Sequence, residues 1–158
     1  GQAVFLDCDM LVRSDITELL EYLDGSDVQV VKHDYRPSTE SKFLNQVQSR
    51  YEKKNWSSVM LFDNAKCRTL TPEAVDSETG LYLHQFKWAS EVGNLPVAWN
   101  HLVTEYPYNP HAKLVHYTLG TPCFAKYANC DYADEWRAEK SLMLSYNAAG
   151  EFRKEKVA

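Results

Sequence analysis

The chain has 158 residues, of which 44% are hydrophobic and 25% are charged, and its formal net charge is −5. This length is enough for one domain with a hydrophobic core, and the composition is ordinary for a globular chain. The negative net charge and the lack of a dense Lys/Arg block argue against nucleic acid as a partner.

The predicted elements alternate between strands and helices. A short, continuously apolar run at 3–7 predicts a buried strand. Asp15 then fits a helix N-cap with Glu18 completing a capping box, and apolar residues from Ile16 to Leu23 have helical spacing. Later in the chain we expect strands at 28–32, 57–63 and 112–118, and helices at 43–54, from 71–75, at 81–93 and at 131–147. This alternation predicts a single α/β domain over 1–158, a mixed sheet flanked by helices.

Asp7 and Asp9 follow directly on the first predicted strand. Residues i and i+2 of a strand point to the same side, so both carboxylates can converge above its carboxyl end. Ligands of open α/β sheets bind at that edge. Two carboxylates so close repel each other, and Mg²⁺ or Mn²⁺ would resolve the repulsion. A structural role without a metal is the alternative, in which one acid caps a helix and the other is solvated.

His116 is the second candidate ligand. It ends the strand predicted at 112–118, and Gly120 and Pro122 then form a turn. Neutral imidazole is a good ligand for Mn²⁺. Taken alone, a histidine in this position can equally be a structural residue.

Four stretches together resemble the retaining glycosyltransferases of the GT-A fold, especially glycosyltransferase family 8, the glycogenin-like and galactosyltransferase-like group. "FLDCDMLVRSDITELL" is similar to the aspartate (DxD) motif of that family. The other three are "NWSSVMLFD", "LPVAWN" and "HYTLGTPCF", and all four occur in the family's order.

The resemblance implies a metal-dependent transfer of a sugar from a nucleoside-diphosphate sugar, with UDP the expected nucleotide, to an unknown acceptor. Asp7, Asp9 and His116 would bind Mn²⁺ or Mg²⁺, which would hold the diphosphate. Gly120 would allow the loop to approach the diphosphate closely. Gln85 matches the amide that stands near the reactive carbon of the sugar. Trp99, Asn100 and Ser58 fall in motifs on the acceptor side.

Four positions depart from the family pattern. His84 precedes Gln85 where the family usually has an acid, and Ser58 replaces a usual Gly. Thr121 and Cys123 occupy positions where the family often has a Lys near the phosphates and a Trp. These departures affect the expected contacts to the donor sugar, the acceptor and the diphosphate.

In a GT-A enzyme about a hundred residues normally precede the aspartate motif and bind the nucleotide base and ribose. Here six residues precede Asp7. We therefore expect a partial GT-A domain that lacks most of the nucleotide-binding half, with poor or absent activity on its own. Sheet edge or apolar surface exposed in this way would favour self-association.

Two other functions are consistent with the sequence. A haloacid-dehalogenase-like phosphatase also opens with an apolar strand and D-x-D, and would use Asp7 as nucleophile and Asp9 as general acid. Met10 and Leu11 depart from that pattern, and no later strand ends in paired acids. The second alternative is a non-catalytic module that binds sugar nucleotides or carbohydrate, with five aromatic residues available for stacking: Trp56, Trp88, Trp99, Tyr106 and Tyr108.

The compartment is predicted from three observations. The chain has no run of 18 apolar residues, and its first residues lack the basic region and cleavage site of a signal peptide. The four cysteines are scattered, without a C-x-x-C pair. These features predict a reduced cytoplasmic protein, with an N-terminal signal or anchor in a longer parent left open.

Overall fold

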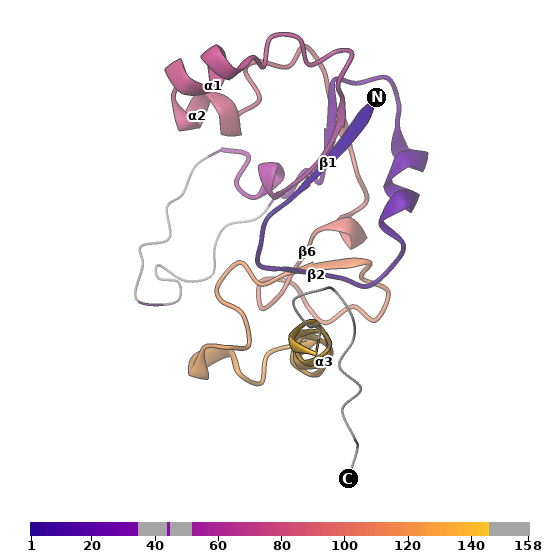
Figure 1. Ribbon diagram of the computed structural model, residues 1–158, viewed down its shortest axis with the longest axis vertical. Coiled ribbons are helices and arrows are strands. Elements are labelled where there is room, and N and C mark those ends of the chain that lie inside the picture. The colour runs from indigo at the N-terminus through magenta and orange to yellow at the C-terminus, as the bar shows by residue number, and fades with distance from the viewer. Residues whose placement is uncertain (35–43, 45–51, 146–158) are drawn as a thin grey trace.

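Two small β-sheets and several short helices form a mixed α/β fold in the computed structural model, which describes residues 1–34, 44 and 52–145 (Figure 1). Both sheets combine parallel and antiparallel pairs. The first sheet has the order β1 (Gln2–Leu6), β4 (Val59–Asp63), β3 (Val28–Val30) and β5 (Val92–Asn94). The second has the order β2 (Met10–Val12), β7 (Leu114–His116) and β6 (His101–Leu102).

Most of the helices in the described part of the chain are short. The 3₁₀ helices are η1 (Ile16–Tyr22), η3 (Trp56–Ser58), η4 (Val97–Trp99) and η5 (Ala125–Tyr127). The α-helices are α1 (Pro72–Ser77), α2 (Gly80–His84) and α3 (Ala133–Leu144). Thr71 caps α1, because its side chain accepts a hydrogen bond from the Ala74 amide.

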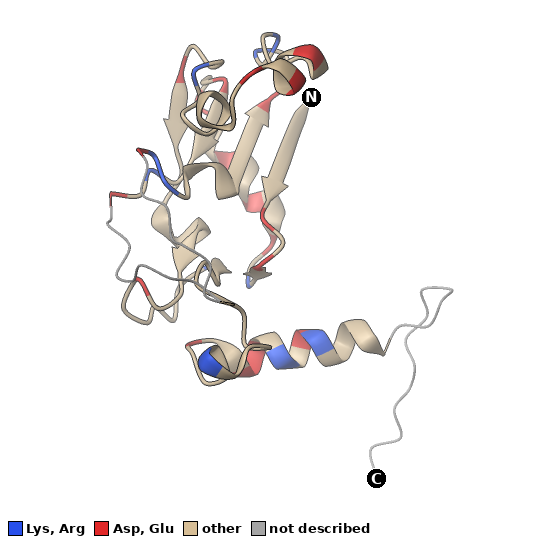
Figure 2. Cartoon of the chain, turned by 90° about the vertical axis from the view of Figure 1, so that its left-hand side faces the viewer, with Lys and Arg blue, Asp and Glu red and all other residues tan. Residues whose placement is uncertain are grey.

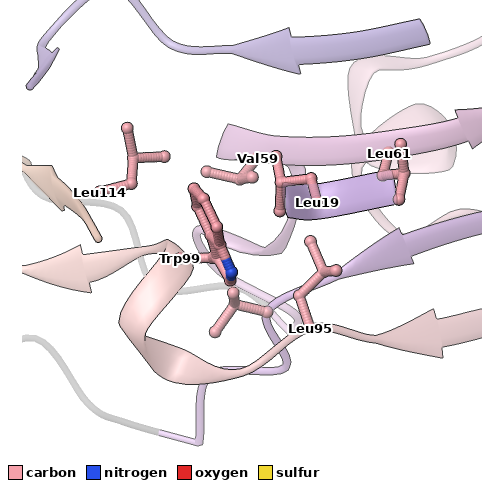
Figure 3. Packing of buried hydrophobic residues seen from close by; sticks show 7 residues of the cluster. Leu19, Val59, Leu61, Leu95, Trp99 and Leu114 are labelled. Atoms are coloured by element: carbon pink, nitrogen blue, oxygen red, sulfur yellow. The ribbon is translucent and has the colours of Figure 1, made fainter. Parts of the chain in front are cut away.

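The main hydrophobic core lies on one face of the four-stranded sheet (Figure 3). Val59 and Leu61 of β4 point to this face, where Trp99 fills the space between the two sheets. The other buried members of the cluster are Leu19, Val31, Leu95 and Leu114. This core joins η1, the four-stranded sheet and β7 into one unit.

The opposite face of the same sheet packs against the segment that contains α1 and α2. Val28 and Val30 of β3 point to this side, together with Met60 and Phe62 of β4. Phe86 and Trp88, which follow α2, cover them. Figure 1 shows α1 and α2 lying together, next to the upper part of this sheet.

The first strand was expected to be buried, and that expectation is wrong. Among the described residues β1 pairs only with β4, so it is the edge strand of its sheet. Val4 and Phe5 are 39% and 44% exposed. The apolar run of the sequence therefore belongs to an edge strand with little cover.

The helix predicted at 81–93 is also wrong, because α2 ends at His84 and residues 92–94 form β5. Phe86 has a φ of 57°, a left-handed conformation that ends the helix. Gly93 allows the parallel pairing with β3, because a Cβ there would lie 2.4 Å from the Ser26 Oγ. Neighbouring side chains leave no room for a Cβ at Gly93, and the pairing with β3 takes precedence over local helical spacing.

The helix predicted after Asp15 is present in a different form. Asp15 does cap the turn after β2, with its carboxylate accepting from the Thr17 amide, but the helix is 3₁₀. Glu18 forms an ion pair with Lys113 instead of the predicted capping box. The helix predicted at 43–54 falls mostly outside the described residues, and its described end at 52–54 is a turn.

Helix α3 closes the described part of the chain and agrees with the helix predicted at 131–147. Arg13, which follows β2, contacts the first turn of α3. Its Nε forms an ion pair with Glu135 Oε2 at 2.7 Å. The rest of α3 projects from the body of the molecule and carries charges of both signs (Figure 2). Within residues 1–34 and 52–145, no helix is long and apolar enough to span a membrane.

Candidate metal centre

Two strand registers bring Asp7, Asp9 and His116 together. The Asp7 amide donates to the Ser58 carbonyl at 3.0 Å, which continues the β1–β4 ladder by one residue. The chain then turns into β2, where Met10 lies opposite His116 of β7. The Tyr117 amide donates to the Asp9 carbonyl at 3.0 Å. The acidic turn is therefore fixed between the two sheets.

The three side chains present one ligand atom each within 4.8 Å of one another. His116 Nε2 lies 3.3 Å from Asp9 Oδ1 and 4.0 Å from Asp7 Oδ2. Ligands bound to a small cation at about 2.1 Å stand about 3 Å apart when adjacent and about 4 Å apart when opposite. Two carboxylates and one imidazole also suit Mn²⁺ or Mg²⁺ chemically. The residues present thus fit a divalent cation.

A buried amide fixes the orientation of the His116 ring. Asn100 donates from Nδ2 to the Asn55 carbonyl at 3.1 Å and to Ser58 Oγ at 2.8 Å. Because the Asn55 carbonyl can only accept, the Asn100 oxygen must face His116, 3.1 Å from Nδ1. His116 Nδ1 therefore carries a proton, and Nε2 is the ring nitrogen that faces the two acids.

A second histidine, His33, lies near His116 and is the next group whose charge matters for a bound cation. His33 is buried and accepts or donates one hydrogen bond with the Tyr106 hydroxyl, 2.8 Å from Nδ1. Burial lowers the pKa of His33 to about 4, with smaller contributions from His116 and His101. Because the pKa of His33 lies well below 7, its ring adds no positive charge that would compete with a bound metal at neutral pH.

A cavity of about 680 Å³ opens from the three ligands. Asp7, Asp9 and His116 form part of its wall, together with Ser58 and Thr118. Lys54, Asn55, Ser57 and His84 add further polar groups, and the remaining lining is apolar. Ser57 Oγ lies 2.6 Å from His84 Nδ1. The volume is in the range of small-molecule sites.

A second cavity of about 360 Å³ shares Asp7 and Asp9 with the first. Cys8, Gly120, Thr121 and Phe124 complete its lining. Gly120 has a φ of 150°, in the region that favours glycine, and its amide donates to the Tyr117 carbonyl at 2.8 Å. The turn that contains Gly120 therefore lies beside the acidic pair, as its place in the sequence suggested.

The remaining predicted site residues have other positions. Trp99 is fully buried in the main core and does not line either cavity. Asn100 is also fully buried and acts on the site through His116. Gln85 ends α2 and is not part of either cavity wall, whereas its neighbour His84 is. Ser58 lines the larger cavity and holds Asn100.

Sequence reasoning missed several residues of the larger cavity. Lys54 ends the helix predicted at 43–54 and Asn55 begins the stretch NWSSVMLFD, but both residues lie in the turn before η3. Asn55 has a φ of 62°, a conformation for which asparagine is enriched. The Asn-Trp-Ser-Ser sequence before an apolar strand was the signal that could have identified this turn.

The fold and the three ligating groups define a mixed α/β protein with a candidate centre for a divalent cation. No protein-family model matches the chain, and no solved structure matches it. Among known proteins it is similar to Protein CDI of Arabidopsis thaliana, with 40% identity over 157 residues. The match covers 93% of this chain and 60% of that protein. The chain therefore spans about three fifths of the length of this relative, whose name states neither an activity nor a ligand.

Proposed function

We propose that the chain is the metal-binding part of a GT-A glycosyltransferase that uses a nucleoside-diphosphate sugar and retains the configuration of the sugar. The observation that carries this proposal is the convergence of Asp7, Asp9 and His116 within 4.8 Å, although His116 lies more than a hundred residues later in the chain. A spacing so long requires the fold to assemble the ligands. Asp7 and Asp9 alone would also suit a helix cap.

In this proposal the side chains have distinct roles. Asp7, Asp9 and His116 hold Mn²⁺ or Mg²⁺, and Asn100 keeps His116 in the tautomer that can bind it. When bound, the cation neutralises negative charge on the leaving diphosphate of a donor such as a UDP-sugar. The smaller cavity beside Gly120 offers room for the diphosphate close to the backbone. The larger cavity remains for the acceptor.

The phosphatase alternative has less support. Such an enzyme needs further acids for Mg²⁺ beside the D-x-D pair. Within the described residues, the group of candidate ligands contains a histidine as its third member and no other acid. One observation favours a binding module without turnover. Gln85, which matches the amide near the reactive carbon of the sugar, lies outside both cavities. Turnover of a UDP-sugar would separate the module from the enzyme.

The cytoplasm is the compartment that we propose. All four cysteines are free: Cys8, Cys67, Cys123 and Cys130. Two of them, Cys8 and Cys123, are exposed. Free thiols at the surface persist in a reducing compartment.

The first test is a calorimetric titration with Mn²⁺, in the absence and presence of UDP. We expect the chain to bind Mn²⁺ and UDP to strengthen that binding. Asp9→Asn keeps the shape of the side chain and removes its charge, so it should weaken Mn²⁺ binding about tenfold or more. His116→Ala should have the same effect.

The matched control is Asp76→Asn, which changes an exposed acid of α1 outside both cavities. This variant should bind Mn²⁺ like the wild type. Equal Mn²⁺ binding by the wild type, Asp9→Asn and His116→Ala would exclude the proposed centre. Hydrolysis of 4-nitrophenyl phosphate that depends on Asp7 would favour the phosphatase instead.

A further inference from the structure

The larger cavity has an apolar floor that leads to the metal centre. Phe5 of β1 lies opposite Met60 of β4 in the sheet register, and Phe62 lies opposite Ala3. Side chains alternate along a strand, so the face that carries Asp7 also carries Phe5 two residues earlier. Residues opposite each other in an antiparallel pair share a face, so Met60 and Phe62 continue this floor. A ligand that touches the acids can therefore extend along an apolar surface.

The segment that contains α1 and α2 adds further apolar side chains and an aromatic ring to the cavity lining. Trp88 lies over Phe62 with their ring centroids 6.0 Å apart and their planes 21° apart. Leu70, Val75 of α1 and Leu83 of α2 complete this wall. Phe5, Phe62 and Trp88 thus give the cavity three aromatic residues. Aromatic walls of this kind favour a flat apolar ring over a strongly hydrated sugar chain.

We propose that this apolar end binds the ring of a small aromatic acceptor whose hydroxyl group reaches the metal centre. The identity of that ligand as an acceptor depends on the proposed glycosyltransferase function, whereas the binding site itself does not. In the reaction, the hydroxyl oxygen forms a bond to the anomeric carbon of the sugar. The bond from that carbon to the diphosphate breaks, the diphosphate leaves with the electron pair, and the hydroxyl proton passes to the diphosphate.

Two exposed apolar residues on neighbouring helices provide a matched pair of variants. Val75 of α1 is 46% exposed and lines the cavity, and Leu81 of α2 is 50% exposed and does not. Val75→Asp places a carboxylate against the proposed ring, and Leu81→Asp places the same group elsewhere on the surface. A carboxylate that loses water to an apolar ligand is strongly disfavoured.

The probe is 4-methylumbelliferone, a fluorescent aromatic phenol, and its binding is followed by fluorescence anisotropy in buffer with EDTA. We expect the wild type and Leu81→Asp to bind it equally. Val75→Asp should bind it about tenfold more weakly, because binding removes the new carboxylate from water. Circular dichroism checks that each variant is folded, and Phe5→Ala replaces Val75→Asp if that variant is not.

The possible results test the aromatic site independently of the metal centre. Wild-type protein that binds Mn²⁺ but not the phenol overturns the aromatic site and leaves the proposed function standing. Equal weakening in both aspartate variants also overturns it, because the effect is then not local to the cavity. Binding that only Val75→Asp weakens supports the aromatic site, even if the Mn²⁺ titration fails.

Discussion

At the scale of single residues, Asn100 decides which nitrogen of His116 can bind a cation. Its amide donates to Asn55 and Ser58, so its oxygen must accept from His116 Nδ1. A histidine whose other nitrogen is held in this way is oriented before any metal arrives. Asn100 is fully buried, so its contribution to the site depends on these hydrogen bonds and not on contact with a ligand.

Asn100→Leu should weaken Mn²⁺ binding by about 10- to 100-fold, the usual effect of losing a partner that orients a ligand. Leucine has a similar volume but cannot accept the Nδ1 proton. Calorimetry measures the affinity, and nitrogen NMR of the metal-free protein reports the His116 tautomer. The NMR signal should show a loss of the pure Nδ1–H form, an effect that lower stability alone would not produce.

Asn129→Leu is the control, because Asn129 is exposed and lies outside both cavities. It should leave the affinity and the tautomer unchanged. Wild-type affinity in Asn100→Leu would mean that the Asn100–His116 hydrogen bond has no part in positioning the ligand.

The resemblance of the sequence motifs implied that Asp7, Asp9 and His116 would bind one cation, and the fold brings the three side chains together between its two sheets. The roles of Trp99 and Asn100 could not be predicted in the same way. They are neighbours at the end of η4, but one side chain enters the core and the other faces His116. Local sequence does not determine which of two adjacent side chains is buried among apolar groups.

At the scale of elements, the apolar pattern of a strand predicts that the strand exists but not where it lies in a sheet. The apolar run of β1 resembled a buried strand, although β1 lies at a sheet edge. The position of a strand in a sheet depends on which other strands pair with it, and these strands are distant in the sequence. The helix expected at 81–93 failed for a related reason, since β5 forms only because β3 is available as a partner.

Strand β4 is central in its sheet, with β1 on one side and β3 on the other, and its packing can be tested directly. Leu61→Ala should lower the free energy of unfolding by about 2 to 5 kcal/mol, because it removes fully buried methyl groups from the main core. Chemical denaturation measures the change. Leu144→Ala, in the exposed part of α3, should change it by less than about 0.5 kcal/mol. Similar losses in both variants would mean that β4 is not the centre of the core.

At the scale of the whole molecule, the feature with the clearest consequence is the side of β1 that no other described strand pairs with. The Asp7 amide donates to the Ser58 carbonyl just before β4, and the Gly1 carbonyl accepts from the Asn64 amide just after it. Because bonding alternates along an antiparallel strand, the N–H and C=O groups of Gln2, Val4 and Leu6 point away from β4. No residue of β1 is charged, so the edge lacks a common protection against pairing with another strand.

We expect two copies to associate through their β1 edges, in antiparallel fashion about a two-fold axis, because an antiparallel pair of identical strands is self-complementary. Sedimentation at several protein concentrations should therefore show a monomer–dimer equilibrium. Val4→Lys places a charge on this edge and should raise the dimer dissociation constant about tenfold or more. Val97→Lys, at a similarly exposed valine of η4, should leave it unchanged. A dimer that withstands Val4→Lys would have to use another surface, and monomers at all concentrations would show that the β1 edge does not pair with its own copy.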